Sequence, residues 1–244
     1  MVLALLTMVV GVLGAVAQAD IKRLLSFTLV SHIGYMILGV ALGTAAGTSA
    51  AIFYIVHHIV VQTTLFLATG LIERTGGTTS INKLGGLLKA SPLLALLFFI
   101  PALNLGGIPP FSGFIGKLAL FEASAAQGTA LSYTLIGAGA LVSLLTLYAL
   151  MRVWNMAFWR PAADVAGYES TLLTNVSEAP NAPAVQKTRT TPRLMVGATA
   201  GMVVLSLALT VFAGPLFALS TRAGTNLEGP GTYVDIVFPG GSDE

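Results

Sequence analysis

The sequence predicts an all-α polytopic membrane protein with about six transmembrane helices. Of its 244 residues, 55% are hydrophobic and only 9% are charged. Soluble domains carry about 25% charged residues, so this composition excludes an ordinary soluble domain. The apolar residues also form long runs, which are long enough to cross the hydrocarbon core of a bilayer as helices.

The predicted spans are apolar runs bounded by polar or turn-forming residues. The first, 1–18, lacks the basic start of a signal peptide, so it is expected to be a spanning helix. The others are expected at 24–43, 50–72, 91–121, 131–158 and 194–220.

The fourth span is interrupted near 103–110 by residues that end or bend helices. They are Asn104, Gly106, Gly107, Pro109 and Pro110. Irregular backbone at membrane depth is tolerated only where protein covers it or where it lines a cavity. The interruption therefore predicts a protected polar site inside the helix bundle.

Two segments have the composition of flexible chain. Residues 159–193 are rich in Ala, Pro, Thr and Asn, and residues 221–244 contain Gly-Pro-Gly and Pro-Gly-Gly. Such sequences bury little apolar surface, so we expect a flexible loop and a flexible C-terminal tail. The expected plan is a five-helix membrane region over 1–158, the loop, a final helix over 194–220 and the tail.

Basic residues orient the predicted helices. The loops after the first, third and fifth spans carry Lys and Arg, whereas the loops after the second and fourth spans carry none. Positive residues are enriched in cytoplasmic loops, so these three loops are expected in the cytoplasm and both ends of the chain outside. The net charge of +2 is too small to indicate binding of nucleic acid.

The sequence shows no signature of a cofactor or reaction centre. The chain has no Cys, which excludes a disulfide framework and a thiolate metal site. The adjacent His57 and His58 make a poor metal pair, because neighbouring side chains on a helix diverge. We see no nucleotide loop, nucleophile elbow or quinone, flavin or haem pattern. We therefore expect no cofactor, no metal and no catalytic residue.

Lys117 is the charge that the fourth span places inside the membrane. An ammonium there costs about 3 kcal/mol on insertion scales, and such residues mark ion or proton pathways. Lost hydration favours the neutral amine, so a buried lysine can exchange a proton at physiological pH. Alternatively, Lys117 lies one turn from the end of the span and snorkels to the outer interface. Glu122 is either a partner or exit group for Lys117 or a solvated carboxylate at the helix end.

Polar residues also mark the second and third spans. In the third, Tyr54, His58 and Gln62 are spaced four apart and share one helical face, with His57 adjacent. Histidine exchanges protons near neutral pH, although such a stripe can equally serve as hydrogen bonds between helices. The second span carries a further polar set that either supports this site or forms a packing face. Its members are Ser31, His32 and Tyr35, and Gly34 and Gly39 would allow close helix approach.

Three stretches resemble the antiporter-like membrane subunits of respiratory complex I and of the Mrp-type multi-subunit sodium/proton antiporters. ADIKRLLSFTLVSHIGYMILGVALG is similar to the family pattern DxKRxLAYSSIxxxGY, and HHIVVQTTLFLATGLIERTG is similar to HAxxKAxLFLxxG. NLGGIPPFSGFIGKLALF is similar to the broken-helix pattern GIPPxxGFxGK. The resemblance covers about residues 1–160, and its finer details resemble the D subunit of the Mrp antiporters.

This resemblance implies that 1–158 is the second inverted-repeat half of a fourteen-helix antiporter-like subunit. In the family, a chain of buried Lys, His and Glu residues carries protons. On that pattern Lys117 falls on the proton-channel lysine of the second broken helix, and His58 on the helix histidine, with His57 beside it. The implied protein is a multi-pass subunit of a bacterial plasma membrane. Its implied partners are other membrane subunits, the lipid bilayer, protons and a monovalent cation, Na⁺.

Two departures from the family pattern qualify this implication. Gln62 stands where many relatives carry the channel lysine, and glutamine relays hydrogen bonds but carries no proton at neutral pH. The predicted spans match only the last six helices of the family, so we expect a C-terminal fragment or a split half. The leading hypothesis is half of a proton path in a cation/proton antiporter. A proton-pumping subunit of NADH–quinone oxidoreductase and a non-transporting membrane scaffold are the alternatives.

Overall fold

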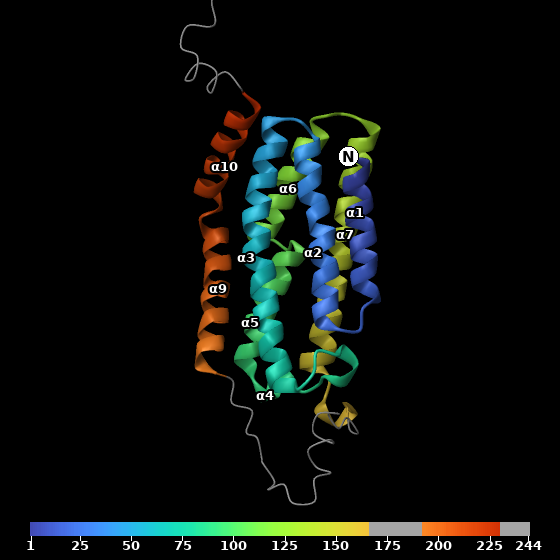
Figure 1. The fold of residues 1–244 in the computed structure, drawn as a ribbon, viewed down its shortest axis with the longest axis vertical. Coiled ribbons are helices and arrows are strands. Elements are labelled where there is room, and N and C mark those ends of the chain that lie inside the picture. Colours follow the sequence, from blue (N-terminus) through green and yellow to red (C-terminus); the bar gives the residue numbers. More distant parts are fainter. Residues whose placement is uncertain (166–191, 230–244) are drawn as a thin grey trace, which may run out of the picture.

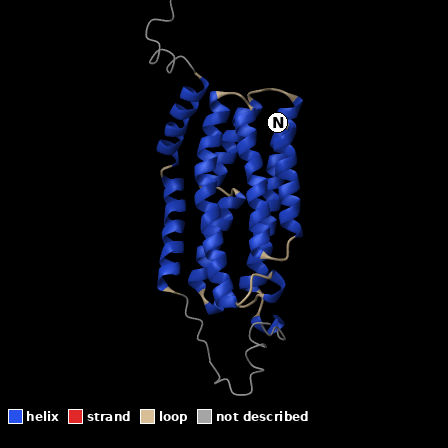
Figure 2. Ribbon diagram, viewed as in Figure 1, coloured by secondary structure: helices blue, strands red, loops and turns tan. Residues whose placement is uncertain are grey.

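The computed structural model describes residues 1–165 and 192–229, and all regular elements in these ranges are helices (Figure 2). The long helices run up and down beside one another, with their connections gathered at the two ends of the bundle (Figure 1). Among the described helices, four are long and apolar enough to cross a membrane, and two shorter apolar helices accompany them. The all-α membrane fold predicted from composition is therefore confirmed.

The first three helices are joined by tight turns. They are α1 (Val2–Ala17), α2 (Ile21–Ala41) and α3 (Ala45–Gly76). The side chains of Asp20 and Thr44 accept hydrogen bonds from the first turns of α2 and α3, and Gly77 ends α3 with a φ of 80°. A side-chain cap at the start and a left-handed glycine after the end are ordinary helix boundaries.

The fourth span is two helices, as the glycines and prolines predict. After η1 (Ile81–Lys83) and α4 (Leu87–Ala90), α5 (Pro92–Gly106) enters the bundle and α6 (Ser112–Ala125) leaves it. The loop between α5 and α6 lies midway along the bundle, where Figure 2 shows it as a short tan segment.

The remaining elements complete the bundle and flank it. α7 (Ala130–Trp154) widens into a π-helical turn, η2 (Asn155–Trp159), and η3 (Ala162–Val165) follows. α9 (Arg193–Val211) and α10 (Ala213–Glu228) form a bent rod along α3 at the side of the bundle (Figure 1).

The structure corrects the expected boundary of the tail. Residues 221–228 were expected to be flexible, but they belong to α10, which ends at Glu228. The helix continues because it packs on α3. A Cβ added at Gly224 would lie 2.3 Å from Ser49 Oγ, and the Thr48 hydroxyl donates to Glu228 at 2.8 Å. The rest of the expected tail from 230 onward, and most of the expected loop (166–191), lie outside the described residues.

Small residues set the close packing of the first helices, as predicted for Gly34 and Gly39. A Cβ at Gly34 would lie 2.4 Å from Met8 Cγ on α1. A Cβ at Gly39 would lie 2.7 Å from Ala51 Cβ on α3. Any larger side chain would therefore separate α2 from its neighbours.

The buried apolar residues form two clusters at different depths, with a polar layer between them. On α3, one cluster contains Tyr54 and the other begins at Val61. On α2 and α7 as well, the buried residues of the two clusters are separated by a gap, a stretch with no buried residue of either cluster. The buried polar residues that lie in sequence within these gaps are Thr28, Ser31, His32, His57, His58 and Thr146. The interior is thus apolar near both ends and polar at mid-depth.

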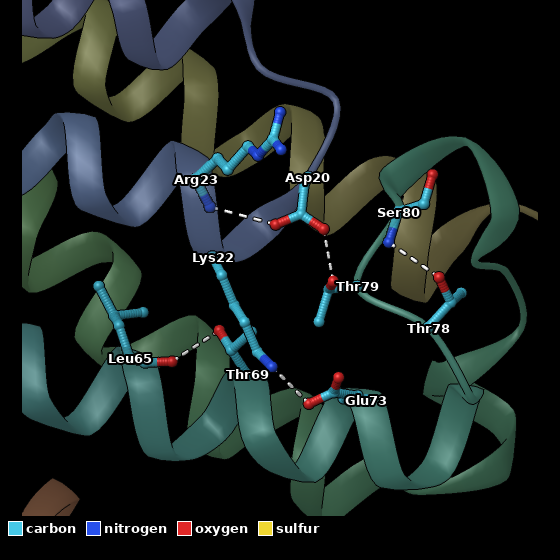
Figure 3. A network of polar contacts seen from close by, with 9 residues as sticks. All are labelled: Asp20, Lys22, Arg23, Leu65, Thr69, Glu73, Thr78, Thr79 and Ser80. Carbon is cyan, nitrogen blue, oxygen red and sulfur yellow. Dashed lines mark hydrogen bonds and ion pairs between the residues drawn. The ribbon is translucent and has the colours of Figure 1, made fainter.

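A hydrogen-bonded network ties the turn between α1 and α2 to the end of α3 (Figure 3). Asp20 Oδ1 accepts from the Arg23 backbone N–H at 3.1 Å, and Asp20 Oδ2 accepts from the Thr79 hydroxyl. Beside it, Lys22 Nζ lies 2.7 Å from a Glu73 carboxylate oxygen, with both side chains about half exposed. The loops rich in basic residues therefore meet at one end of the bundle.

Candidate functional site

The amine of Lys117 points into the break between α5 and α6. Lys117 Nζ donates to the carbonyl oxygens of Leu105 at 3.0 Å and Gly106 at 3.3 Å. It also donates to Ser143 Oγ on α7 at 2.8 Å, and that hydroxyl donates to the Gly106 carbonyl at 2.7 Å. The side chain is only 3% exposed. Lys117 therefore points into the protein interior, and the snorkelling alternative is wrong for this conformation.

The partial negative charge at the end of α5 faces this amine. The last carbonyls of a helix have no intrahelical partner and carry the negative end of the helix dipole, which favours a cation. In the described ranges no carboxylate lies within 4 Å of Lys117, since the ion pair found there joins Lys22 to Glu73. Carbonyl and hydroxyl dipoles thus replace a counter-ion.

Glycine lets the broken helix close around the amine. Gly107 ends α5 with a φ of 80°, and an added Cβ would lie 3.1 Å from Lys117 Nζ. At Gly113, in the first turn of α6, an added Cβ would lie 2.0 Å from the Asn104 carbonyl oxygen. Gly113 was not singled out from the sequence, although it stands in the recognised GIPPxxGFxGK pattern.

His57 connects α3 to the start of α6. Its Nδ1 lies 3.0 Å from Ser112 Oγ, which donates to Asn104 Oδ1 at 3.3 Å. Asn104 Oδ1 also accepts the Gly113 backbone N–H at 3.0 Å. Asn104, predicted only as a helix breaker, therefore caps the first turn of α6 while lying in the last turn of α5.

His58 and His32 face each other from α3 and α2. Their ring centroids are 5.0 Å apart. His32 Nδ1 lies 2.9 Å from the Tyr54 hydroxyl, and His32 Nε2 lies 3.5 Å from Thr146 Oγ1 on α7. Tyr54 in turn lies 5.5 Å, ring to ring, from His57. Three histidines from two helices are thus linked through one tyrosine.

Several buried polar atoms in this cluster have no protein partner within the described ranges. They are His57 Nε2, both ring nitrogens of His58, Gln62 Oε1 and Asn104 Nδ2. Buried polar atoms almost always have a hydrogen-bond partner, so these atoms keep the capacity to donate or accept further hydrogen bonds. Gln62 is anchored by its amide, which donates to the Leu25 carbonyl at 2.7 Å.

The other predicted residues fall into separate roles. Tyr35 borders the site, because Lys117 Nζ lies 5.4 Å from its ring centroid, and its hydroxyl donates to the Gly139 carbonyl at 2.5 Å. Ser31 instead faces α1, donating to the Met8 carbonyl at 2.7 Å. Glu122 is exposed and lines a cavity of about 550 Å³ bounded by α3, α6 and α10.

Two hydroxyls at the site were missed in the sequence. Ser143 and Thr146 lie three apart on α7, so they share one helical face, and both contact predicted site residues. That spacing, within the otherwise apolar stretch 135–147, was the available signal.

Residues 1–146 match the family model described as NADH:quinone oxidoreductase/Mrp antiporter, TM. The chain belongs to this family. The matched stretch contains Lys117 and all three histidines of the cluster, so the polar layer and the broken helix lie within the family's shared region.

Curated relatives include antiporter and oxidoreductase subunits. The chain is 46% identical over 159 residues to the D subunit of the Na(+)/H(+) antiporter of Alkalihalophilus pseudofirmus, covering 65% of this chain and 32% of that protein. It is 35% identical over 226 residues to the NAD(P)H-quinone oxidoreductase subunit 2 of a Synechococcus species, covering 91% of this chain and 40% of that protein. The chain thus spans about a third of the length of the antiporter relative.

Solved structures share the fold. A chain of the Mrp complex from Dietzia sp. superposes with a TM-score of 0.77 at 35% identity, covering 97% of this chain and 48% of that one. A chain of respiratory complex I from Thermus thermophilus superposes with a TM-score of 0.64 at 26% identity, covering 89% of this chain and 44% of that one. The predicted resemblance to both groups is therefore confirmed.

Proposed function

We propose that this chain is part of a membrane subunit of a multi-subunit monovalent cation/proton antiporter and provides half of its proton path. The observation that carries the proposal is the buried polar layer, in which Lys117 and three histidines lie between two apolar clusters. The 46% identity to the D subunit of a Na(+)/H(+) antiporter supports this assignment, with Na⁺ as the proposed coupled cation.

In this proposal Lys117 is the group that takes up and releases the proton. Carbonyl and hydroxyl oxygens hold its ammonium without a fixed carboxylate, so the amine can lose its charge without leaving a buried anion behind. His57 and His58 relay the proton, because their free ring nitrogens can accept and donate in turn.

His32, Tyr54 and Gln62 support the relay in this scheme. The Tyr54 hydroxyl and His32 Nδ1 form a hydrogen bond beside His58, while Gln62 contributes an amide that bonds but does not ionise. The histidines therefore perform the central step for which many relatives use a lysine at the position of Gln62. The end of the bundle with the basic loops is proposed to face the cytoplasm.

The test replaces Lys117 in the intact complex. We expect Lys117→Ala and Lys117→Arg both to reduce antiport to background, because alanine has no exchangeable proton and arginine keeps its proton at physiological pH. Antiport is measured as cation-dependent collapse of a pH gradient in inverted membrane vesicles. Arg23→Gln removes an exposed cation and serves as the control, with immunoblots to verify that each complex assembles.

Normal antiport in Lys117→Arg would mean that a fixed positive charge is sufficient, which would refute proton transfer by this amine. Normal antiport in Lys117→Ala would favour the non-transporting scaffold. Both outcomes are interpretable only where the variant complex reaches the membrane in normal amount.

A second candidate is a proton-pumping subunit of an NADH–quinone oxidoreductase. The match to the NAD(P)H-quinone oxidoreductase subunit 2 favours it, because that alignment covers 91% of this chain. The subunits that co-purify with the chain separate the two candidates. Hydrophilic redox subunits would identify an oxidoreductase, and only membrane subunits would identify an antiporter.

A further inference from the structure

A second cavity opens at the basic end of the bundle, away from the polar layer. It lies between α4 and the segment that follows α7, both near the bottom of Figure 1. Its volume is about 690 Å³, within the usual range for a small-molecule site. Most of its walls are apolar, and they include Leu88, Ala90, Phe158, Pro161 and Ala162.

This part of the chain is held in place by its own hydrogen bonds. The Gly86 backbone N–H donates to the Arg160 carbonyl at 2.7 Å. Arg160 Nη2 donates to the Asn82 carbonyl at 2.7 Å and to the Leu84 carbonyl. A Cβ at Gly85 would lie 2.8 Å from a methyl group of Val165. The cavity is therefore formed by packed elements.

The charged groups at this cavity are positive. Lys89 and Arg160 line it, and among the residues that the structure describes no carboxylate does. Within the described ranges, Arg160 Nε is buried without a hydrogen-bond partner, and the exposed Lys89 has no carboxylate within 4 Å. Arginine and lysine together favour an anion with several acceptor oxygens, such as a phosphate.

The apolar walls and the position of the cavity indicate a lipid. Trp159 lines the cavity and is 69% exposed, and tryptophan is enriched where a membrane protein meets the headgroup region. A free phosphate would leave the apolar walls uncovered, whereas a phospholipid would place its glycerol and first acyl carbons against them. We propose that this cavity binds an anionic phospholipid of the phosphatidylglycerol type, with its phosphate near Lys89 and Arg160.

Native mass spectrometry of the chain with its co-purifying subunits tests the proposal. The complex is delipidated and then titrated with phosphatidylglycerol or phosphatidylcholine. We expect one phosphatidylglycerol to be retained in preference to phosphatidylcholine. Lys89→Gln should weaken its retention about fivefold, the change expected for one basic residue near an anionic surface. Trp159→Leu should also weaken retention. Arg23→Gln removes one exposed cation at the same end of the bundle and should leave retention unchanged.

Equal retention of the two lipids would overturn the proposal, and so would equal retention by Lys89→Gln and the unaltered chain. Displacement of phosphatidylglycerol by millimolar inorganic phosphate would show that the site takes soluble phosphate, which also contradicts it. Lys89 lies on the surface of a short helix, so its replacement is expected to leave folding intact. A fall in retention can then be assigned to the lost charge.

Discussion

Gly113 decides how closely the two halves of the broken helix approach. Its hydrogen atom stands where a Cβ would be 2.0 Å from the Asn104 carbonyl oxygen and 3.0 Å from His57 Nε2. Side chains never approach a backbone oxygen so closely. The hydrogen bond between the Gly113 N–H and Asn104 Oδ1 therefore depends on the missing methyl group. A single residue thus positions both the Lys117 helix and the histidine that contacts its first turn.

We expect Gly113→Ala to lower the free energy of unfolding by about 1–3 kcal/mol, the usual cost of forcing extra atoms into a packed site. The measurement is the thermal midpoint of the purified complex in detergent. Gly137→Ala is the matched control, because Gly137 is helical and an added Cβ there meets nothing within 4 Å. Alanine favours helix over glycine, so the control should be unchanged or slightly more stable. Similar midpoints for the two variants would contradict the close approach described at Gly113.

At the scale of the helices, Asp20 joins two separate elements. It caps α2 through one carboxylate oxygen and binds Thr79, beyond the end of α3, through the other (Figure 3). Lys22 and Glu73 also join α2 to α3, but both side chains are about half exposed to solvent. Helix caps generally contribute more to stability than exposed ion pairs do. We therefore expect Asp20 to contribute more to the free energy of unfolding than the ion pair between Lys22 and Glu73.

We expect Asp20→Ala to destabilise the protein by about 1–2 kcal/mol, since a lost cap typically costs about 1 kcal/mol and the Thr79 hydroxyl also loses its acceptor. Glu73→Gln should change stability by less than about 1 kcal/mol, as exposed ion pairs do. Denaturation midpoints of the two variants check this order. A larger effect for Glu73→Gln would mean that the ion pair, and not the cap, holds this end of the bundle together.

The sequence predicted the elements that hydropathy and helix breakers define, and it missed those that depend on packing. The apolar runs and the Gly and Pro residues near 103–110 predicted the helices and the break between α5 and α6. The single final helix predicted over 194–220 is wrong, because the structure has two helices there, α9 and α10, which meet at Phe212. α10 extends to Glu228 because Gly224 packs on Ser49, a contact between segments distant in sequence that no local pattern encodes. The contact between Lys117 and Ser143 was likewise invisible, since it requires α7 to lie beside the break.

At the scale of the whole molecule, polarity varies with depth along the bundle. Lys22 in the first turn of α2, Lys89 in α4 and Arg160 after η2 lie at one end of the bundle, and the middle holds the buried polar layer. The turns that join α2 to α3 and α6 to α7 at the other end contain no Lys or Arg (Figure 1). A membrane protein oriented by its positive loops would place the first end in the cytoplasm. The polar layer would then lie near the centre of the bilayer, between the two apolar clusters, where the proposed proton path crosses it.

This orientation can be tested cleanly because the chain contains no cysteine. Arg23→Cys and Ala126→Cys introduce single exposed thiols at opposite ends of the bundle. In intact cells, a membrane-impermeant maleimide is expected to label Ala126→Cys, and to label Arg23→Cys only after the membrane is permeabilised. The unaltered chain should not react in either condition.

The reverse pattern would invert the topology and would place the cavity beside Lys89 at the outer surface. Labelling of both thiols in intact cells, while a cytosolic thiol protein in the same cells stays unlabelled, would show that the chain adopts both orientations. That result would refute a single orientation set by the basic loops.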